Sequence, residues 1–130
     1  MITASTKSLY VGLAINSLIE GIIPTYPIIA DKGATYPFCV YRRTSFNENL
    51  TKDLKVSGYI ETVGLELVIA CTKYKESVEL AQQIKDKLES TRNEIIEGVQ
   101  VRTIEILNCQ ENWANDAYFQ IMTLRIEIEK

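Results

Sequence analysis

The chain has 130 residues, of which 46% are hydrophobic and 24% charged, and this is enough for one globular domain, 1–130, with a core of its own. The net charge of −3 argues against a basic nucleic-acid groove, so we expect no sequence-specific nucleic-acid partner. No apolar run approaches the roughly 20 residues that a membrane-spanning helix needs, and we expect no membrane contact either.

Residues 4–19 form the first predicted helix, because their apolar side chains recur at near-helical spacing and Gly21 can end the helix. The segment 22–37 holds all three prolines of the chain. Proline fixes φ at extended values and is tolerated at strand ends, so this segment predicts an extended arm with a turn at Lys32-Gly33. The β-rich run Tyr36–Arg43 then predicts the first strand of a sheet.

Residues 46–55 are polar and show no clear period, which predicts a loop that often serves as an interaction surface. Residues 56–72 alternate apolar positions in the manner of a strand. The period then changes, and residues 73–92 predict the clearest amphipathic helix of the chain. Its apolar stripe consists of Val78, Ala81, Ile84 and Leu88.

After a turn at 93–98, residues 99–110 predict a strand in which the buried side changes, so we expect a bulge near Arg102-Thr103. Residues 111–116 predict another turn. Residues 117–129 alternate well and predict a last strand with one buried side. This order of elements predicts an α+β fold, namely an antiparallel β-sheet of about four strands with two main helices packed on one face.

The chain contains no histidine, which removes the usual general base and the commonest zinc ligand. The three cysteines, Cys39, Cys71 and Cys109, are far apart and odd in number, which indicates reduced thiols and intracellular synthesis. Glu61 and Glu66 should face opposite sides of one strand, which disfavours a catalytic carboxylate pair. Phosphate-binding and calcium-binding motifs are absent. We therefore expect no catalytic residue, no metal site and no cofactor.

Arg42 and Arg43 are adjacent on a predicted strand, so their side chains should point to opposite faces. One should reach solvent, and the other should pair with an acid or lie at a strand end. Three interpretations stay open: ordinary strand-end charges, contacts in a protein interface and contacts with nucleic acid. Arginine suits an interface because its planar fork pairs with carboxylates while its stem packs.

Trp113, the only tryptophan, lies in a predicted turn and either packs onto the core or belongs to an interface. The tyrosines of the arm likewise either cover the core or lie on a neighbouring subunit. Together these features predict a protein interface. Its candidate residues are Tyr26, Lys32, Tyr36, Arg42, Arg43, Asn47, Asn49, Lys52 and Trp113.

In combination, several of these segments resemble one known family. They are the arm Tyr26–Phe38, the run Val40–Arg43, the helix pattern Tyr74-x-x-Ser77-x-x-Leu80-Ala81 and the strand pair around Asp116-Ala117-Tyr118. In this order they resemble the tail completion proteins of long-tailed phages and prophages, also called tail-to-head joining or tail terminator proteins. The chain differs from that pattern by a longer segment at Asn93–Gly98.

The resemblance implies an α+β fold and a structural, non-catalytic role in the virion tail, after synthesis in the bacterial cytoplasm. Proteins of this family cap the tail tube and join it to the head connector, usually as a sixfold ring. The implied partners are therefore further copies of the chain, the tail tube protein and the head–tail connector proteins. An alternative is a small cytoplasmic ligand- or peptide-binding module of bacterial origin, which would need a deep pocket with converging polar groups.

Overall fold

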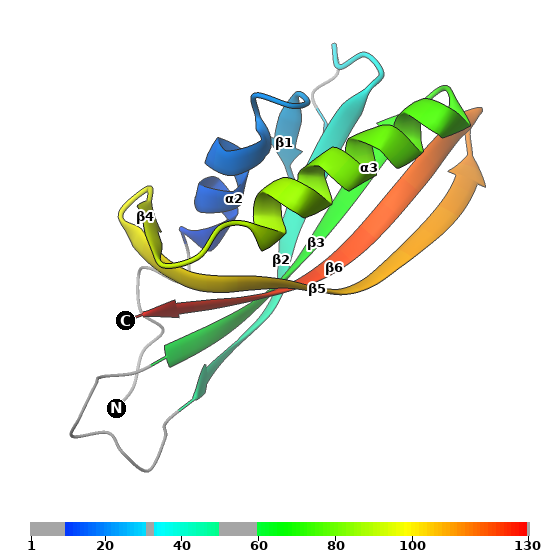
Figure 1. The fold of residues 1–130 in the computed structure, drawn as a ribbon. Coiled ribbons are helices and arrows are strands. Elements are labelled where there is room, and N and C mark those ends of the chain that lie inside the picture. Colours follow the sequence, from blue (N-terminus) through cyan, green and yellow to red (C-terminus); the bar gives the residue numbers. More distant parts are fainter. Residues whose placement is uncertain (1–9, 31–32, 50–59, 130) are drawn as a thin grey trace, which may run out of the picture.

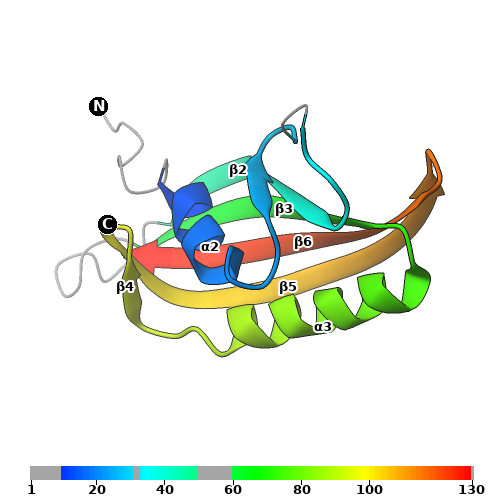
Figure 2. The ribbon, with the colours of Figure 1, turned by 90° about the horizontal axis from the view of Figure 1, so that it is seen from above.

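The computed structural model of this protein describes residues 10–30, 33–49 and 60–129. Within these ranges, six strands form one curled sheet, and two helices lie on its inner side (Figure 1, Figure 2). In chain order the elements are α2 (Val11–Ile19), β1 (Thr25–Pro27), β2 (Phe38–Asn49), β3 (Ile60–Cys71), α3 (Tyr74–Glu89), β4 (Glu94–Ile96), β5 (Val99–Ala114) and β6 (Ala117–Glu129).

The strands follow the order β1-β2-β3-β6-β5-β4 across the sheet. β1 runs parallel to β2, and the four other pairs are antiparallel. The prediction of an antiparallel sheet of about four strands is therefore wrong. The two additional strands, β1 in the predicted arm and β4 in the predicted turn, have three residues each, which is too short to show a period. Pro27 is tolerated in β1 because this strand lies at the sheet edge.

Both described helices lie over the concave face of the sheet (Figure 1). α3 packs on β3, β5 and β6, whereas α2 packs on β1, β2 and α3. α3 confirms the amphipathic helix predicted at 73–92, and α2 confirms the later part of the helix predicted at 4–19, whose residues 4–9 lie outside the described residues. Neither of these helices is long and apolar enough to cross a membrane.

The core fills the space between the helices and the concave face. Leu65 of β3 pairs with Leu124 of β6, Leu67 pairs with Met122, and all four side chains are almost completely buried. The alternation predicted for residues 117–129 is confirmed by this pattern. Each such side chain stabilises the fold by about 1.5–3 kcal/mol through burial.

A tight turn joins the two longest strands. Asn115 and Asp116 have φ of 50° and 59°, and Ala114 pairs with Ala117 across them. Two central residues with positive φ form the hairpin turn whose twist matches that of the strands, and asparagine and aspartate tolerate this conformation. The turn predicted at 111–116 is therefore wrong for residues 111–114, which belong to β5.

Irregularities in the strands were predicted only in part. β5 changes register between Val101 and Thr103, which confirms the predicted bulge. The loop predicted at 46–55 is wrong for residues 46–49, which belong to β2 and pair with β3. Pairing with a neighbouring strand outweighs their polar composition here. Residues 50–55 lie outside the described residues.

Candidate interface groove beside helix α3

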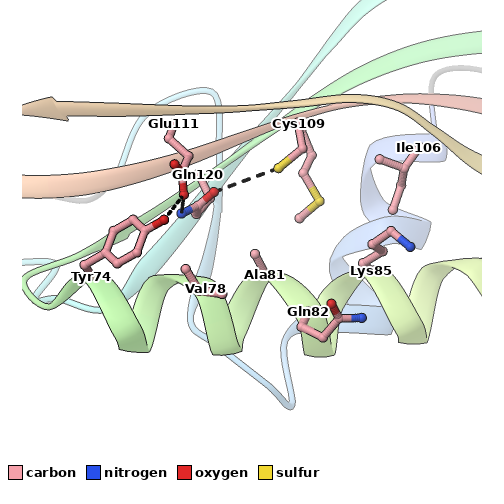
Figure 3. A pocket seen from close by; sticks show the side chains of 10 residues that line it. Tyr74, Val78, Ala81, Gln82, Lys85, Ile106, Cys109, Glu111 and Gln120 are labelled. Atoms are coloured by element: carbon pink, nitrogen blue, oxygen red, sulfur yellow. Dashed lines mark hydrogen bonds between the residues drawn. The ribbon is translucent and has the colours of Figure 1, made fainter.

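A groove with a cavity volume of about 250 Å³ runs between α3 and the strands β5 and β6 (Figure 3). We call it the α3–β5 groove. Val78 lies on the predicted apolar stripe of the helix, yet its side chain is 42% exposed at this groove. The lining residues are Tyr74, Val78, Ala81, Gln82, Lys85, Ile106, Cys109, Glu111, Gln120 and Met122. The groove thus presents apolar surface to solvent between polar ends.

Regular geometry brings these side chains together. Tyr74, Val78 and Gln82 are four residues apart on α3 and therefore share one side of the helix. On the opposite wall, Cys109 of β5 pairs with Met122 of β6, and Glu111 pairs with Gln120. Because paired residues of antiparallel strands point to the same face, these four side chains all face α3.

Hydrogen bonds close one end of the groove (Figure 3). The Tyr74 hydroxyl donates to Glu111 Oε2 at 2.6 Å, and Gln120 Nε2 donates to the same oxygen at 2.9 Å. Gln120 Nε2 also lies 3.2 Å from Ser77 Oγ, and Ser77 in turn donates to the Tyr74 carbonyl. Gln120 and Ser77 are buried polar residues, so this network satisfies groups that would otherwise destabilise the core.

The same contacts move two pKa values away from neutrality. The hydrogen bonds from Tyr74 and Gln120 lower the pKa of Glu111 below its usual value. The bond to the Glu111 carboxylate raises the pKa of Tyr74. At neutral pH the carboxylate therefore stays ionised and the phenol stays protonated. A general acid or base works best with a pKa near the operating pH, so neither group is suited to proton transfer.

Aromatic side chains extend the groove toward the tip of the β5–β6 hairpin. The Trp113 and Tyr118 rings have centroids 4.6 Å apart, and the Tyr74 and Tyr118 rings are 5.4 Å apart. A second hollow of about 260 Å³ lies against these three rings. Trp113 is 53% exposed, so it packs on Tyr118 and still offers a ring face to solvent. Exposed tryptophan and tyrosine beside a hollow are typical of protein interfaces.

The tyrosines predicted for the interface lie elsewhere, near β1 and the start of β2. The Tyr36 ring stacks on Phe38 with centroids 5.2 Å apart, and the Tyr26 ring meets Phe38 edge-on at 6.3 Å. They form an aromatic cluster with Phe38, and Tyr36 remains 40% exposed. Lys32, predicted beside them, lies outside the described residues.

The two arginines separate as predicted, toward opposite faces of β2. Arg42 Nε lies 3.1 Å from Glu66 Oε1, and Glu66 alternates along β3 with the buried Leu65 and Leu67, so this pair lies on the outer face of the sheet. Arg42 is 60% exposed, and such a surface pair contributes only about 0–1 kcal/mol. Arg43 is exposed. It pairs with Leu65, which faces the core, so Arg43 belongs to the inner face of β2.

The remaining predicted residues belong to the far end of β2 and the segment after it. Asn47 and Asn49 belong to β2 by their backbones, and their side chains, like Lys52, lie outside the described part of the chain. The predicted interface residues that the structure describes are therefore not one surface. The arm tyrosines lie at the β1 edge of the sheet, and Trp113 lies on β5, which β2, β3 and β6 separate from β1.

Sequence reasoning missed most of the groove. No sequence motif marks Cys109, Glu111 or Gln120. Only the alternation of side chains along β5 and β6 could have placed them on one face. Val78 belongs to the predicted apolar stripe of the helix, and the stripe alone does not say where the sheet beneath it ends.

No protein-family model matches this chain, and no curated protein matches it. Solved structures share its fold. A chain of a structure titled "Virion of native gene transfer agent (GTA) particle" is 9% identical with a TM-score of 0.61, over 96% of this chain and 91% of that chain. A second solved structure is 10% identical with a TM-score of 0.57, over 98% of each chain. At this level of identity the likeness is one of fold, and it extends over nearly the whole of each chain.

Proposed function

We propose that this protein is a structural component of a phage-like virion tail. In this role it forms an oligomeric ring that caps the tail tube and joins it to the head connector. Its partners are further copies of itself, the tail tube protein and the connector proteins. The observation that carries the proposal is the likeness of fold to a chain of a virion particle, over 96% of this chain. The tail completion pattern seen in the sequence supports the more specific role.

The chemistry of the groove supports a binding role without catalysis. Glu111 and Tyr74, the ionisable pair at its closed end, have pKa values displaced away from neutrality. The exposed surface next to them is aromatic and aliphatic, as in the centre of a protein interface. We therefore propose that the α3–β5 groove contacts another protein subunit.

The proposal is tested by offering the protein a tail tube. Purified tubes that lack their terminal protein are incubated with this protein and imaged by negative stain. We expect added density at one end of each tube and tubes of uniform length. Unchanged tubes at saturating protein concentration would contradict the role in tail completion.

A ligand- or peptide-binding module is the second candidate, and the groove is the observation that favours it. Its volume of about 250 Å³ lies below the range of roughly 300–1,000 Å³ that is usual for small-molecule sites. Side chains of a protein partner fit such a shallow hollow better than a whole small molecule. Thermal-shift screening separates the two candidates, since a small-molecule site predicts stabilisation by individual compounds.

A further inference from the structure

Ile28 and Ile29 form an exposed apolar tip directly after β1. Their side chains are 74% and 76% exposed, the highest values among the large hydrophobic residues that the structure describes. Isolated exposed apolar side chains are common on protein surfaces. Two adjacent ones on a protruding turn form a small surface that gains free energy when another protein covers it. We call this pair the arm tip.

The backbone holds the arm tip in a fixed and unfavourable conformation. The Ile28 N–H donates to the Tyr41 carbonyl at 2.7 Å, and the Ile29 N–H donates to the Pro27 carbonyl at 2.5 Å. The second bond closes a three-residue γ-turn around Ile28, whose φ is 62°. A positive φ is a genuine outlier for a β-branched residue, and glycine would suit this position better. The side chain of Ile28 is thus retained at a conformational cost.

The α3–β5 groove has the size and lining to receive this tip. Its volume of about 250 Å³ exceeds the roughly 150 Å³ of an apolar cavity that accommodates benzene. Ala81, Ile106 and Met122 provide aliphatic surface inside it, and Val78 forms an exposed rim. A branched aliphatic side chain would therefore exchange water for close packing there.

The arm tip and the groove belong to opposite edges of the same sheet. β1 is one edge, and β2, β3 and β6 separate it from β5 (Figure 2). The tip therefore lies away from the groove of its own copy, and the groove open to it is that of another copy. Contact between two different surfaces of identical chains is heterologous, and it closes into a ring when the rotation between copies allows it.

Charge favours the same pairing of edges. Residues 21–44, which include β1 and the first half of β2, contain three basic and one acidic side chain, a net charge of +2. Residues 73–114, which include α3, β4 and β5, contain six basic and eight acidic side chains, a net charge of −2. Glu66 already pairs with Arg42 and offsets part of the charge of the first segment, so charge adds less to this pairing than the apolar contact does.

We infer that the arm tip of each copy docks in the α3–β5 groove of the next copy, and that this contact builds the ring. The inference rests on the proposed ring-forming function and specifies the residues that make the contact. Cys109 lines the groove, so its thiol can form a disulfide with a cysteine introduced into the segment that occupies the groove.

Disulfide trapping tests the contact without requiring a stable oligomer. The variant Ile29→Cys is concentrated and mildly oxidised, and the products are separated by non-reducing electrophoresis. We expect covalent dimers and longer chains that join residue 29 of one copy to Cys109 of the next. The background change Cys109→Ser should abolish them. Ile95→Cys is the matched control, because Ile95 is 72% exposed but lies on β4. Equal yields of cross-linked product from Ile29→Cys and Ile95→Cys would overturn the inference.

Mixing two variants tests the head-to-tail geometry. The double variant Ile28→Ser with Ile29→Ser removes the tip and keeps the groove, while Val78→Asp spoils the groove and keeps the tip. Each variant alone should associate with itself roughly tenfold or more weakly than wild type, as expected for a lost aliphatic anchor. An equimolar mixture should form dimers with one intact contact and no larger species. Gln83→Asp, an exposed change on α3 that does not line the groove, is the control and should leave association unchanged.

The outcomes separate this inference from the proposed function. If both variants cap tail tubes and form rings like wild type, the groove contact is wrong and the structural role stands. If wild type forms rings and residue 29 cross-links to Cys109 but tail tubes stay uncapped, the contact is supported and the role in tail completion is wrong. Circular dichroism of each variant checks that the changed surface residues leave the fold intact.

Discussion

At the scale of single residues, one hydrogen-bond network closes an end of the groove. Glu111 accepts hydrogen bonds from Tyr74 and Gln120 at one oxygen, and the buried amide of Gln120 also reaches Ser77. A charged acceptor strengthens such bonds relative to neutral ones. The network therefore fixes the position of α3 on the hairpin and gives the groove a defined wall.

Removing the Tyr74 hydroxyl should raise the pKa of Glu111. Because the folded-state pKa of Glu111 is depressed, its contribution to stability is complete above the unfolded pKa and is lost as the pH falls through the folded value. Tyr74→Phe removes the largest cause of the depression, so less stability should be lost on acidification. The measurement is an NMR titration of the Glu111 side chain in wild type and variant. An unchanged titration would show that the hydroxyl does not hold the carboxylate in solution.

Replacing Ile28 by glycine should stabilise the monomer while it weakens assembly. Glycine relieves a backbone conformation that costs of order 1–3 kcal/mol, although it adds entropy to the unfolded chain. We expect a net gain of about 1 kcal/mol in urea unfolding. Ile29→Gly is the matched control, because Ile29 is not among the residues with positive φ, and it should lose about 0.5–1 kcal/mol. Equal effects of the two changes would argue against strain at Ile28.

Glu61 is a buried carboxylate whose two oxygens have no hydrogen-bond partner within the described part of the chain. A buried polar group left unsatisfied costs about 1–3 kcal/mol, and a charged group costs more. Glu61→Met keeps a similar length without the charge and should raise the free energy of unfolding by at least about 1 kcal/mol. The check is a denaturant midpoint at neutral pH, and a lower midpoint would mean that the carboxylate has a stabilising partner.

At the scale of elements, α2 approaches the sheet closely because residue 12 has no side chain. A Cβ at Gly12 would lie 2.8 Å from the ring of Tyr41, which is buried. Glycine weakens a helix by about 1 kcal/mol relative to alanine, so its presence indicates that the close approach matters more. The aromatic ring thus packs against the helix backbone itself.

Gly12→Ala should therefore destabilise the protein despite the better helix propensity of alanine. Overpacking a core costs about 1–3 kcal/mol, against a gain of about 1 kcal/mol in the helix, so we expect a net loss of about 1 kcal/mol. Thermal or urea unfolding measures this loss. Gly21→Ala has no heavy atom within 4 Å of the added Cβ and should leave the midpoint nearly unchanged. A stabilised Gly12→Ala variant would show that the ring shifts freely.

The long elements could be predicted from the sequence and the short ones could not. The periods of α3 and β6 extend over 16 and 13 residues, which is long enough to identify both. β1 and β4 exist only because a neighbouring strand offers hydrogen bonds to three residues each. The groove depends on how far α3 reaches beyond the core, as the exposure of Val78 shows, and no local pattern reports that.

At the scale of the whole molecule, one sheet carries two surfaces that suit head-to-tail assembly. The sheet carries an apolar tip at its β1 edge and an apolar groove beside β5, near the opposite edge. The segments that contain the two edges have net charges of opposite sign. In a head-to-tail assembly each added copy still presents one free tip or groove at each end, until a ring closes. A closed head-to-tail ring is the assembly that the proposed role in tail completion needs.

The mass of the wild-type protein in solution tests this claim most directly. Light scattering is recorded across a concentration series, with Val78→Asp measured in parallel. Wild type should grow with concentration into one closed species, a sixfold multiple of the 14.8 kDa chain, while Val78→Asp should stay smaller. A wild-type protein that stops at a dimer, or a Val78→Asp variant that reaches the same closed mass, would contradict head-to-tail assembly through the groove.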